Sequence, residues 1–199
     1  MQMTSTLSRR AALARALSLS LVASTGPFAS GAAAQPAIAG SGTLVVYFSR
    51  TGNTRVIANQ IRRARAADLF EIEPADPYPE DYEATVSQAQ RERDTSYEPR
   101  LKSTVPNIGS YDVVFLGFPI WGTTAPAVIR SFLSAHDLSG RTLIPFITHG
   151  GYGRGGSMAV LAEHAPRARL LDGLTLQADQ ERQTLASVTG WLGGIDLNR

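Results

Sequence analysis

A turn rich in hydroxyls follows the first long apolar run of the folded part of the chain. The run extends from Leu44 to Phe48, and a helical pattern begins at Asn53. Hydroxyl groups, free backbone N–H groups and the positive end of a helix dipole would converge at this turn, which suits a phosphate. A simple helix cap is the alternative, because Asn and Thr cap helices well. The triphosphate and dinucleotide glycine motifs are both absent. The candidate phosphate-binding residues are Ser49, Arg50, Thr51, Gly52, Asn53 and Thr54.

Two later loops combine aromatic side chains with glycine. The indole of Trp121 suits stacking on a flat conjugated ring, and Gly122 leaves the adjacent peptide free to turn over. The second loop places Tyr152 among closely spaced glycines that would let the backbone approach a ligand. Packing of the indole on its own helix and a plain surface loop are the alternatives, and His149 is read more readily as a structural residue than as an acid-base catalyst. The candidate ring-binding residues are Pro119, Ile120, Trp121, Gly122, Thr123, His149, Gly150, Gly151, Tyr152 and Gly153.

Alternating strands and helices must position these loops. Continuous apolar strands between helices predict an α/β fold, because a parallel sheet with helices on both faces buries both sides of each strand. In such a sheet ligands bind beyond the carboxyl ends of the strands, where the three loops lie. The predicted strands are 44–48, 69–72, 113–116, 143–148 and 168–176, the last interrupted at Gly173, and the predicted helices are 53–64, 125–133, 157–164 and 184–192.

Two features depart from regular alternation. Residues 74–106 form a predicted insertion in the second crossover, with a Pro-rich turn and an amphipathic helix near 81–93. Pro145 lies inside the fourth predicted strand, although proline cannot donate a hydrogen bond to a central ladder. We therefore expect either the start of the strand or a bulge at Pro145.

Composition and charge exclude several classes of function. The chain has no cysteine, which excludes disulfides, thiolate metal sites and a cysteine nucleophile. The first 34 residues hold three of the 19 basic residues and no acid, so the rest carries 16 basic and 17 acidic residues, a net charge of −1. No basic stripe with interleaved aromatics is present, so no nucleic-acid partner is expected.

The N-terminal segment 1–34 predicts an export signal that is removed. Arg9 and Arg10 precede a short apolar stretch, and residues 32–34 offer an A-x-A cleavage site. The segment resembles a bacterial twin-arginine (Tat) signal, which implies a folded, periplasmic protein; a disordered tail, an organelle transit peptide and a cytoplasmic location are the alternatives. The apolar stretch is too short to span a bilayer, so no stable membrane insertion is expected. The predicted organisation is a signal at 1–34, a linker at 35–42 and one domain at 43–199.

The loops together resemble those of the flavodoxin family. The segment from Ser49 to Thr54 matches its S/T-x-T-G-N-T phosphate signature, and segments 117–124 and 149–157 look like its two ring-binding loops. The resemblance implies a five-stranded sheet of order 2-1-3-4-5, flavin mononucleotide (FMN) as cofactor, and Trp121 and Tyr152 flanking the ring. It also implies that the Trp121–Gly122 peptide lies near flavin N5. Many relatives have a second Trp where Gly122 stands.

Two functions follow from these patterns. The first is an electron carrier that passes electrons to a redox partner protein. The second is an enzyme, an FMN-dependent NAD(P)H oxidoreductase that reduces a quinone or similar small-molecule electron acceptor. In both, the flavin performs the redox step and the protein tunes it. The absence of a second dinucleotide motif favours the carrier, and a flavin-free structural domain is a third possibility.

Overall fold

The computed structural model describes residues 42–177 and 181–197. The predicted export signal at 1–34 and nearly all of the predicted linker at 35–42 lie outside the described residues. Among the helices of the described part, none is long and apolar enough to cross a membrane.

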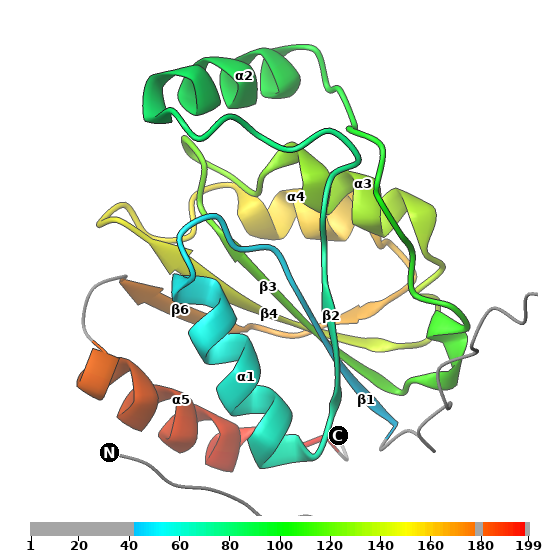
Figure 1. Ribbon diagram of the computed structural model, residues 1–199. Helices are drawn as coiled ribbons and strands as arrows, with labels where there is room; N and C mark the ends of the chain where they lie inside the picture. The colour runs from blue at the N-terminus through cyan, green and yellow to red at the C-terminus, as the bar shows by residue number, and fades with distance from the viewer. Residues whose placement is uncertain (1–41, 178–180, 198–199) are drawn as a thin grey trace, which may run out of the picture. The chain divides into compact units, whose positions relative to one another are not determined.

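A parallel sheet occupies the centre of the described part (Figure 1). Its strand order is β2-β1-β3-β4-β5, with β6 also paired to β4, which confirms the predicted α/β fold and the order that the resemblance implies. The pairings of β1 with β2 and β3, and of β4 with β3, β5 and β6, are all parallel. The strands are β1 (Thr43–Tyr47), β2 (Asp68–Glu71), β3 (Val113–Pro119), β4 (Thr142–His149), β5 (Arg169–Leu170) and β6 (Leu174–Gln177).

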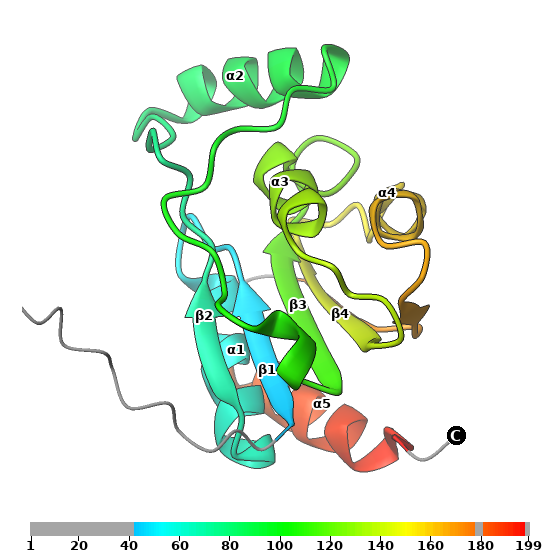
Figure 2. The same ribbon diagram turned by 90° about the vertical axis from the view of Figure 1, so that its right-hand side faces the viewer.

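Helices cover both faces of the sheet, as Figures 1 and 2 show. Alternate residues of one strand point to opposite faces, so Val45 and Phe115 pack toward one face and Val46 and Leu116 toward the other. Helices α1 (Asn53–Arg65) and α5 (Glu181–Gly194) lie on the first face, and α3 (Ala127–Ala135) and α4 (Ser157–His164) lie on the second. Both faces of the central strands are therefore buried, which explains their continuous apolar runs.

Two of the element boundaries that differ from the predictions have a clear physical reason. Strand β3 continues to Pro119 because β4 pairs with it that far, so residues 117–119 belong to the sheet rather than to a loop. A Cβ at Gly117 would overlap the ring of Phe146, which explains the glycine inside this strand. Helix α3 begins only at Ala127, because Pro126 is its N-cap and has an extended ψ of 152°.

Pro145 lies inside β4 and coincides with a break in the neighbouring strand. The carbonyl oxygen of Leu143 accepts a hydrogen bond from the N–H of Leu171 (2.9 Å), so position 145, two residues on, faces the same neighbour. That neighbour is interrupted between β5 and β6, and a Cβ on Gly173 would overlap the Pro145 carbonyl oxygen. The missing donor of Pro145 thus falls where no strand is paired. Pro145 itself lies inside β4 and pairs with Leu116, so the predicted strand start or bulge at this residue is wrong, and the irregularity is a break in the neighbouring strand.

The insertion contains helix α2 (Tyr82–Asp94), which confirms the helix predicted near 81–93. Asp81 caps it by accepting a hydrogen bond from the N–H of Ala84 (2.8 Å). The insertion returns to the sheet through β3 after a 3₁₀ turn at Ile108–Ser110. His136, at the end of α3, holds the returning segment because its Nε2 accepts a hydrogen bond from the Val105 N–H (2.9 Å). Burial lowers the pKa of His136, which keeps Nε2 available as an acceptor.

We predict that Gly173→Ala destabilises the protein by about 1–3 kcal/mol, the usual cost of forcing extra atoms into a packed site. The new Cβ would lie 2.6 Å from Pro145 Cγ and would also overlap the Pro145 carbonyl oxygen. Chemical denaturation would measure the change in the free energy of unfolding. Gly109→Ala is the control, because a Cβ there meets no atom within 4 Å. Equal stability of the two variants would contradict this packing of the broken strand.

Candidate functional site

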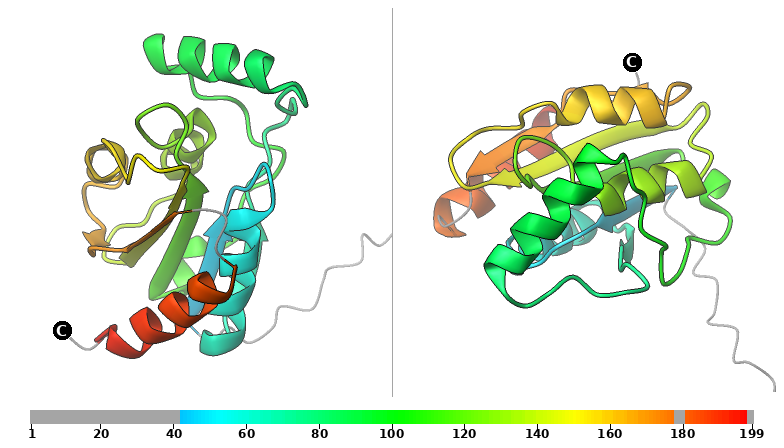
Figure 3. Two further views of the ribbon diagram at one scale, coloured as in Figure 1. Left: turned by 90° about the vertical axis from the view of Figure 1, so that its left-hand side faces the viewer. Right: turned by 90° about the horizontal axis from the view of Figure 1, so that it is seen from above.

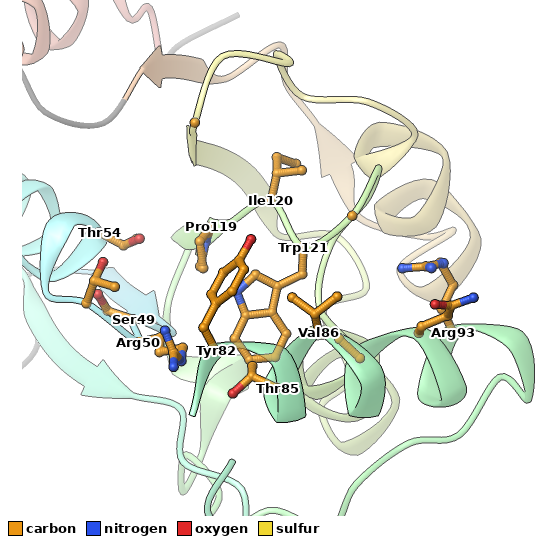
Figure 4. Close-up of a pocket in the computed structure, with 15 residues that line it drawn as sticks. Ser49, Arg50, Thr54, Tyr82, Thr85, Val86, Arg93, Pro119, Ile120 and Trp121 are labelled. Atoms are coloured by element: carbon orange, nitrogen blue, oxygen red, sulfur yellow. The ribbon is translucent and has the colours of Figure 1, made fainter. Parts of the chain in front are cut away.

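A pocket of about 360 Å³ lies where the loop after β1, the end of β3 and helix α2 meet (Figure 4). The loop after β1 forms one end, the segment after β3 forms the floor, and α2 forms a wall. Figure 3 shows α2 crossing above the sheet when the molecule is seen from above. The lining residues are Ser49, Arg50, Thr51, Thr54, Tyr82, Thr85, Val86, Ala89, Gln90, Arg93, Pro119, Ile120, Trp121, Gly122 and Gly150.

The N-terminus of α1 closes one end of this pocket. Gly52 is the N-cap residue and has a φ of 95°, a left-handed conformation that favours glycine. Its N–H donates to Ser49 Oγ (3.1 Å), which leaves the Ser49 hydroxyl hydrogen free for a ligand. Among the described residues no side chain caps α1, and its first turn holds no acid. The positive end of the helix dipole therefore faces the pocket without an internal anion, as a phosphate site requires.

Thr54 and Arg50 connect this loop to other parts of the molecule. The hydroxyl oxygens of Thr54 and Thr148 lie 2.9 Å apart in the core, which joins the start of α1 to β4. When Thr148 donates, the Thr54 hydroxyl hydrogen remains free for an anion. Arg50 donates from Nη2 to the backbone oxygen of Glu80 (2.6 Å), just before α2. The insertion is thus tied to the end of the pocket that the loop after β1 forms.

Trp121 forms the apolar floor at the other end. Its ring meets Phe48 and Tyr78 edge-on, with centroid separations of 5.2 Å and 4.7 Å. The indole is half-buried and lies beside Pro119 and Ile120 in the pocket (Figure 4). These edge-on contacts hold the indole in place, and because Trp121 also lines the pocket, it can contact a flat ligand there.

A tight turn supports Trp121. The Trp121 N–H donates to the Thr124 oxygen (3.0 Å), and Gly122 within the turn has a φ of 65°. The glycine-rich loop packs on this turn, because the Gly156 N–H donates to the Thr123 oxygen (2.9 Å). A Cβ on Gly155 would overlap the same oxygen. The glycine at 155 therefore permits close packing between the two loops.

The structure brings some of the predicted site residues to the pocket and leaves others outside it. Tyr152 is 90% exposed, and it does not line the pocket as a second stacking ring would. His149 accepts a hydrogen bond at Nδ1 from the Gly151 N–H (3.0 Å), which is a contact within its own loop. The predicted residues that do not line the pocket are Gly52, Asn53, Thr123, His149, Gly151, Tyr152 and Gly153.

Helix α2 supplies the pocket residues that sequence reasoning missed. Tyr82 is 65% exposed and Val86 is 42% exposed, although both are apolar and face the pocket. The signal was present in the helical spacing of one face, although nothing in the sequence indicated which partner that face had. The members of this face are Tyr82, Thr85, Val86, Ala89, Gln90 and Arg93.

A buried polar cluster fixes α2 against α3. Tyr78 donates to Glu92 Oε2 (2.9 Å), and Gln88 donates to Glu92 Oε1 (2.8 Å). Arg130 of α3 donates from Nη2 to the backbone oxygens of Glu92 (3.0 Å) and Tyr97 (2.8 Å). Burial and the adjacent Glu92 carboxylate raise the pKa of Tyr78, so its hydroxyl stays protonated as the donor.

The arrangement fits a phosphorylated flat ring. Hydroxyls and uncapped N–H groups gather at one end, and the Trp121 indole with apolar neighbours lies at the other. Within the described ranges no cluster of His, Asp and Glu could hold a metal ion.

Comparison with known proteins agrees with the sequence resemblance. A sequence profile of the flavodoxin family matches residues 42–193. A proposed flavoprotein from Bacteroides eggerthii is 37% identical over 75% of this chain and 97% of its own, with a TM-score of 0.64. One from Bacteroides uniformis is 30% identical over 74% and 97%, with a TM-score of 0.66. Comparison with curated proteins gives no significant match.

A more distant structure shares the fold. It is a flavoprotein from Lactobacillus acidophilus in complex with FMN, 19% identical over 75% of this chain and 97% of its own, with a TM-score of 0.59. The profile match spans the described sheet and the covering helices, and it includes all three loops that form or adjoin the pocket. This chain belongs to the flavodoxin family.

Proposed function

We propose that this protein binds FMN in the pocket between α1, Trp121 and α2 and transfers electrons through it. The uncapped, acid-free start of α1, facing the same pocket as a half-buried indole, is the observation that carries the proposal. Membership of the flavodoxin family supports FMN as the cofactor.

Different residues would hold the phosphate and the ring of the cofactor. Ser49, Thr51 and Thr54 and the first N–H groups of α1 would hold the phosphate, because they present donors at the positive end of the helix. Trp121 would stack on the ring and shield one of its faces from water. When bound, FMN supplies the redox chemistry of its ring.

An electron carrier is the first form of this function. The sequence carries no dinucleotide motif for NAD(P)H, and the redox partner would be another protein. The near-neutral domain would steer a charged partner only weakly, so encounter would depend little on net charge.

A small-molecule reductase is the second form. The exposed apolar side chains of Tyr82 and Val86 on the pocket wall favour it, because they offer surface to a flat substrate beside the flavin. Such an enzyme would take hydride from NAD(P)H and pass electrons to a quinone or similar acceptor.

We further propose that the protein is exported to the periplasm after residues 1–34 direct it to the twin-arginine route. That route carries folded proteins, which suits a protein that takes up FMN in the cytoplasm before it leaves. The Arg9–Arg10 pair and the A-x-A site at 32–34 support the proposal.

The visible spectrum of the purified protein tests the central proposal. We expect a flavin spectrum, and chromatography of the released cofactor should identify FMN rather than FAD or riboflavin. Addition of NADPH under anaerobic conditions then separates the two forms: rapid bleaching indicates the reductase, and an unchanged spectrum indicates the carrier. Colourless protein that takes up no added FMN would exclude both.

We predict that Trp121→Ala weakens FMN binding by about 1 kcal/mol, roughly fivefold in Kd, because one ring stack is lost. The midpoint potential should rise, because a stacked indole disfavours the negatively charged reduced ring and shields it from water. Titration with FMN and a redox titration measure the two effects.

Trp191→Ala is the matched control for this substitution. Trp191 packs edge-on against Phe115 at a centroid separation of 5.9 Å, on the face covered by α1 and α5. We expect it to lower the free energy of unfolding and leave the potential unchanged. Trp121→Phe should keep most of the affinity because it retains an aromatic face. Unchanged affinity and potential in Trp121→Ala would mean that the ring does not lie against Trp121.

We predict that the mature protein from its native host lacks residues 1–34. N-terminal sequencing should find a start at or near Gln35, and replacement of Arg9 and Arg10 by lysine should retain the precursor in the cytoplasm. An intact Met1 on protein recovered from the periplasm would contradict the proposed cleavage.

A further inference from the structure

The guanidinium of Arg93 lies against Gly122 at the end of the pocket. A Cβ built on Gly122 would lie 2.6 Å from Arg93 Nη1, so a larger residue at 122 would displace the guanidinium. Figure 4 shows Arg93 on α2, beyond Val86 and away from the phosphate loop. The glycine at 122 therefore makes room for a positive charge beside the turn that carries Trp121.

Contacts of the preceding residue, Glu92, fix the backbone from which Arg93 extends. Glu92 is buried, its carboxylate is held by Tyr78 and Gln88, and its backbone oxygen accepts a hydrogen bond from Arg130. Because this end of α2 is bound to α3 and to the Tyr78 ring, the backbone at Arg93 is held beside the pocket.

The charge of Arg93 is only weakly compensated. Within the described part of the chain its ion-pair partner is Asp94, with 3.9 Å between Nε and Oδ1, and the side chain of Asp94 is 61% exposed. An exposed pair at this separation contributes little. The nearby Glu92 carboxylate already has Tyr78 and Gln88 as donors. Arg93 thus brings a permanent positive charge to a half-enclosed, largely apolar pocket, where screening by salt is weaker than at the surface.

We propose that Arg93 stabilises the negative charge that the flavin ring acquires on reduction. This inference rests on the proposed function, which places the ring against Trp121 and hence next to Gly122. Two-electron reduction takes up two electrons and one proton and leaves one negative charge on the ring at neutral pH. Attraction between that charge and the guanidinium favours the reduced state over the neutral oxidised state. Arg93 thereby raises the midpoint potential of the flavin. This effect opposes that of the Trp121 indole, which disfavours the negatively charged reduced ring.

Equilibrium redox titration of the FMN-loaded full-length protein with dithionite tests this assignment. In Arg93→Gln we expect reduced FMN to bind five- to tenfold more weakly relative to oxidised FMN, which lowers the two-electron midpoint potential by about 20–30 mV. The Kd for oxidised FMN should change less than about twofold, because the oxidised ring is neutral. Arg93→Lys retains the charge, so its midpoint potential should lie closer to the wild-type value than to that of Arg93→Gln.

Arg91→Gln is the matched control, because Arg91 lies on the same helix, carries the same charge and is exposed outside the pocket. Its potential should stay at the wild-type value. An equal potential in Arg93→Gln and wild type, or an equal fall in Arg91→Gln, would overturn the assignment. The assignment would also be overturned if Arg93→Gln weakened the binding of oxidised FMN as much as that of reduced FMN, because an equal loss of affinity would indicate a structural role. Failure of wild-type protein to bind FMN would instead reject the proposed function itself.

Discussion

Parallel pairing of β1, β3 and β4 is the constraint on which the pocket depends. Tyr47 pairs with Gly117 and Gly117 with Phe146, so the three strands end at one edge of the sheet. The Ile120 N–H donates to the Thr148 oxygen (2.8 Å), which continues the ladder to the floor of the pocket. A one-residue shift of register would move each packed side chain to the opposite face and separate the loops.

The same edge is completed by a segment that belongs to neither the sheet nor its covering helices. Helix α2 reaches it through a long insertion and stays there because buried hydrogen bonds connect Glu92 to Tyr78 and to Arg130. Tyr78 in turn contacts Trp121, so the wall and the floor of the pocket share one support. A substitution in this buried cluster would therefore move the Trp121 indole, although no residue of the cluster need contact a ligand.

The pocket holds positive charge at particular places, although the net charge of the domain is small. The domain after residue 34 is nearly neutral, yet an uncapped helix N-terminus lies at one end of the pocket and a guanidinium lies at the other. Such placement suits a cofactor with a permanent phosphate charge and a ring whose charge changes with redox state. The apolar floor formed by Trp121 and its neighbours raises the effect of a nearby charge because it excludes water.

The sequence by itself determined the α/β class and the order of elements, and it singled out the loop 49–54 and Trp121 as candidate ligand contacts, because continuous apolar runs and the loop residues carry those signals locally. It also located Pro145 as an irregularity. Only the tertiary structure decided that the break at Gly173 in the neighbouring strand accommodates this proline, that Tyr152 lies outside the pocket, and that α2 forms a wall with Arg93 beside Gly122. Helical spacing reveals that a face exists, but which surface it meets depends on contacts between residues far apart in the chain.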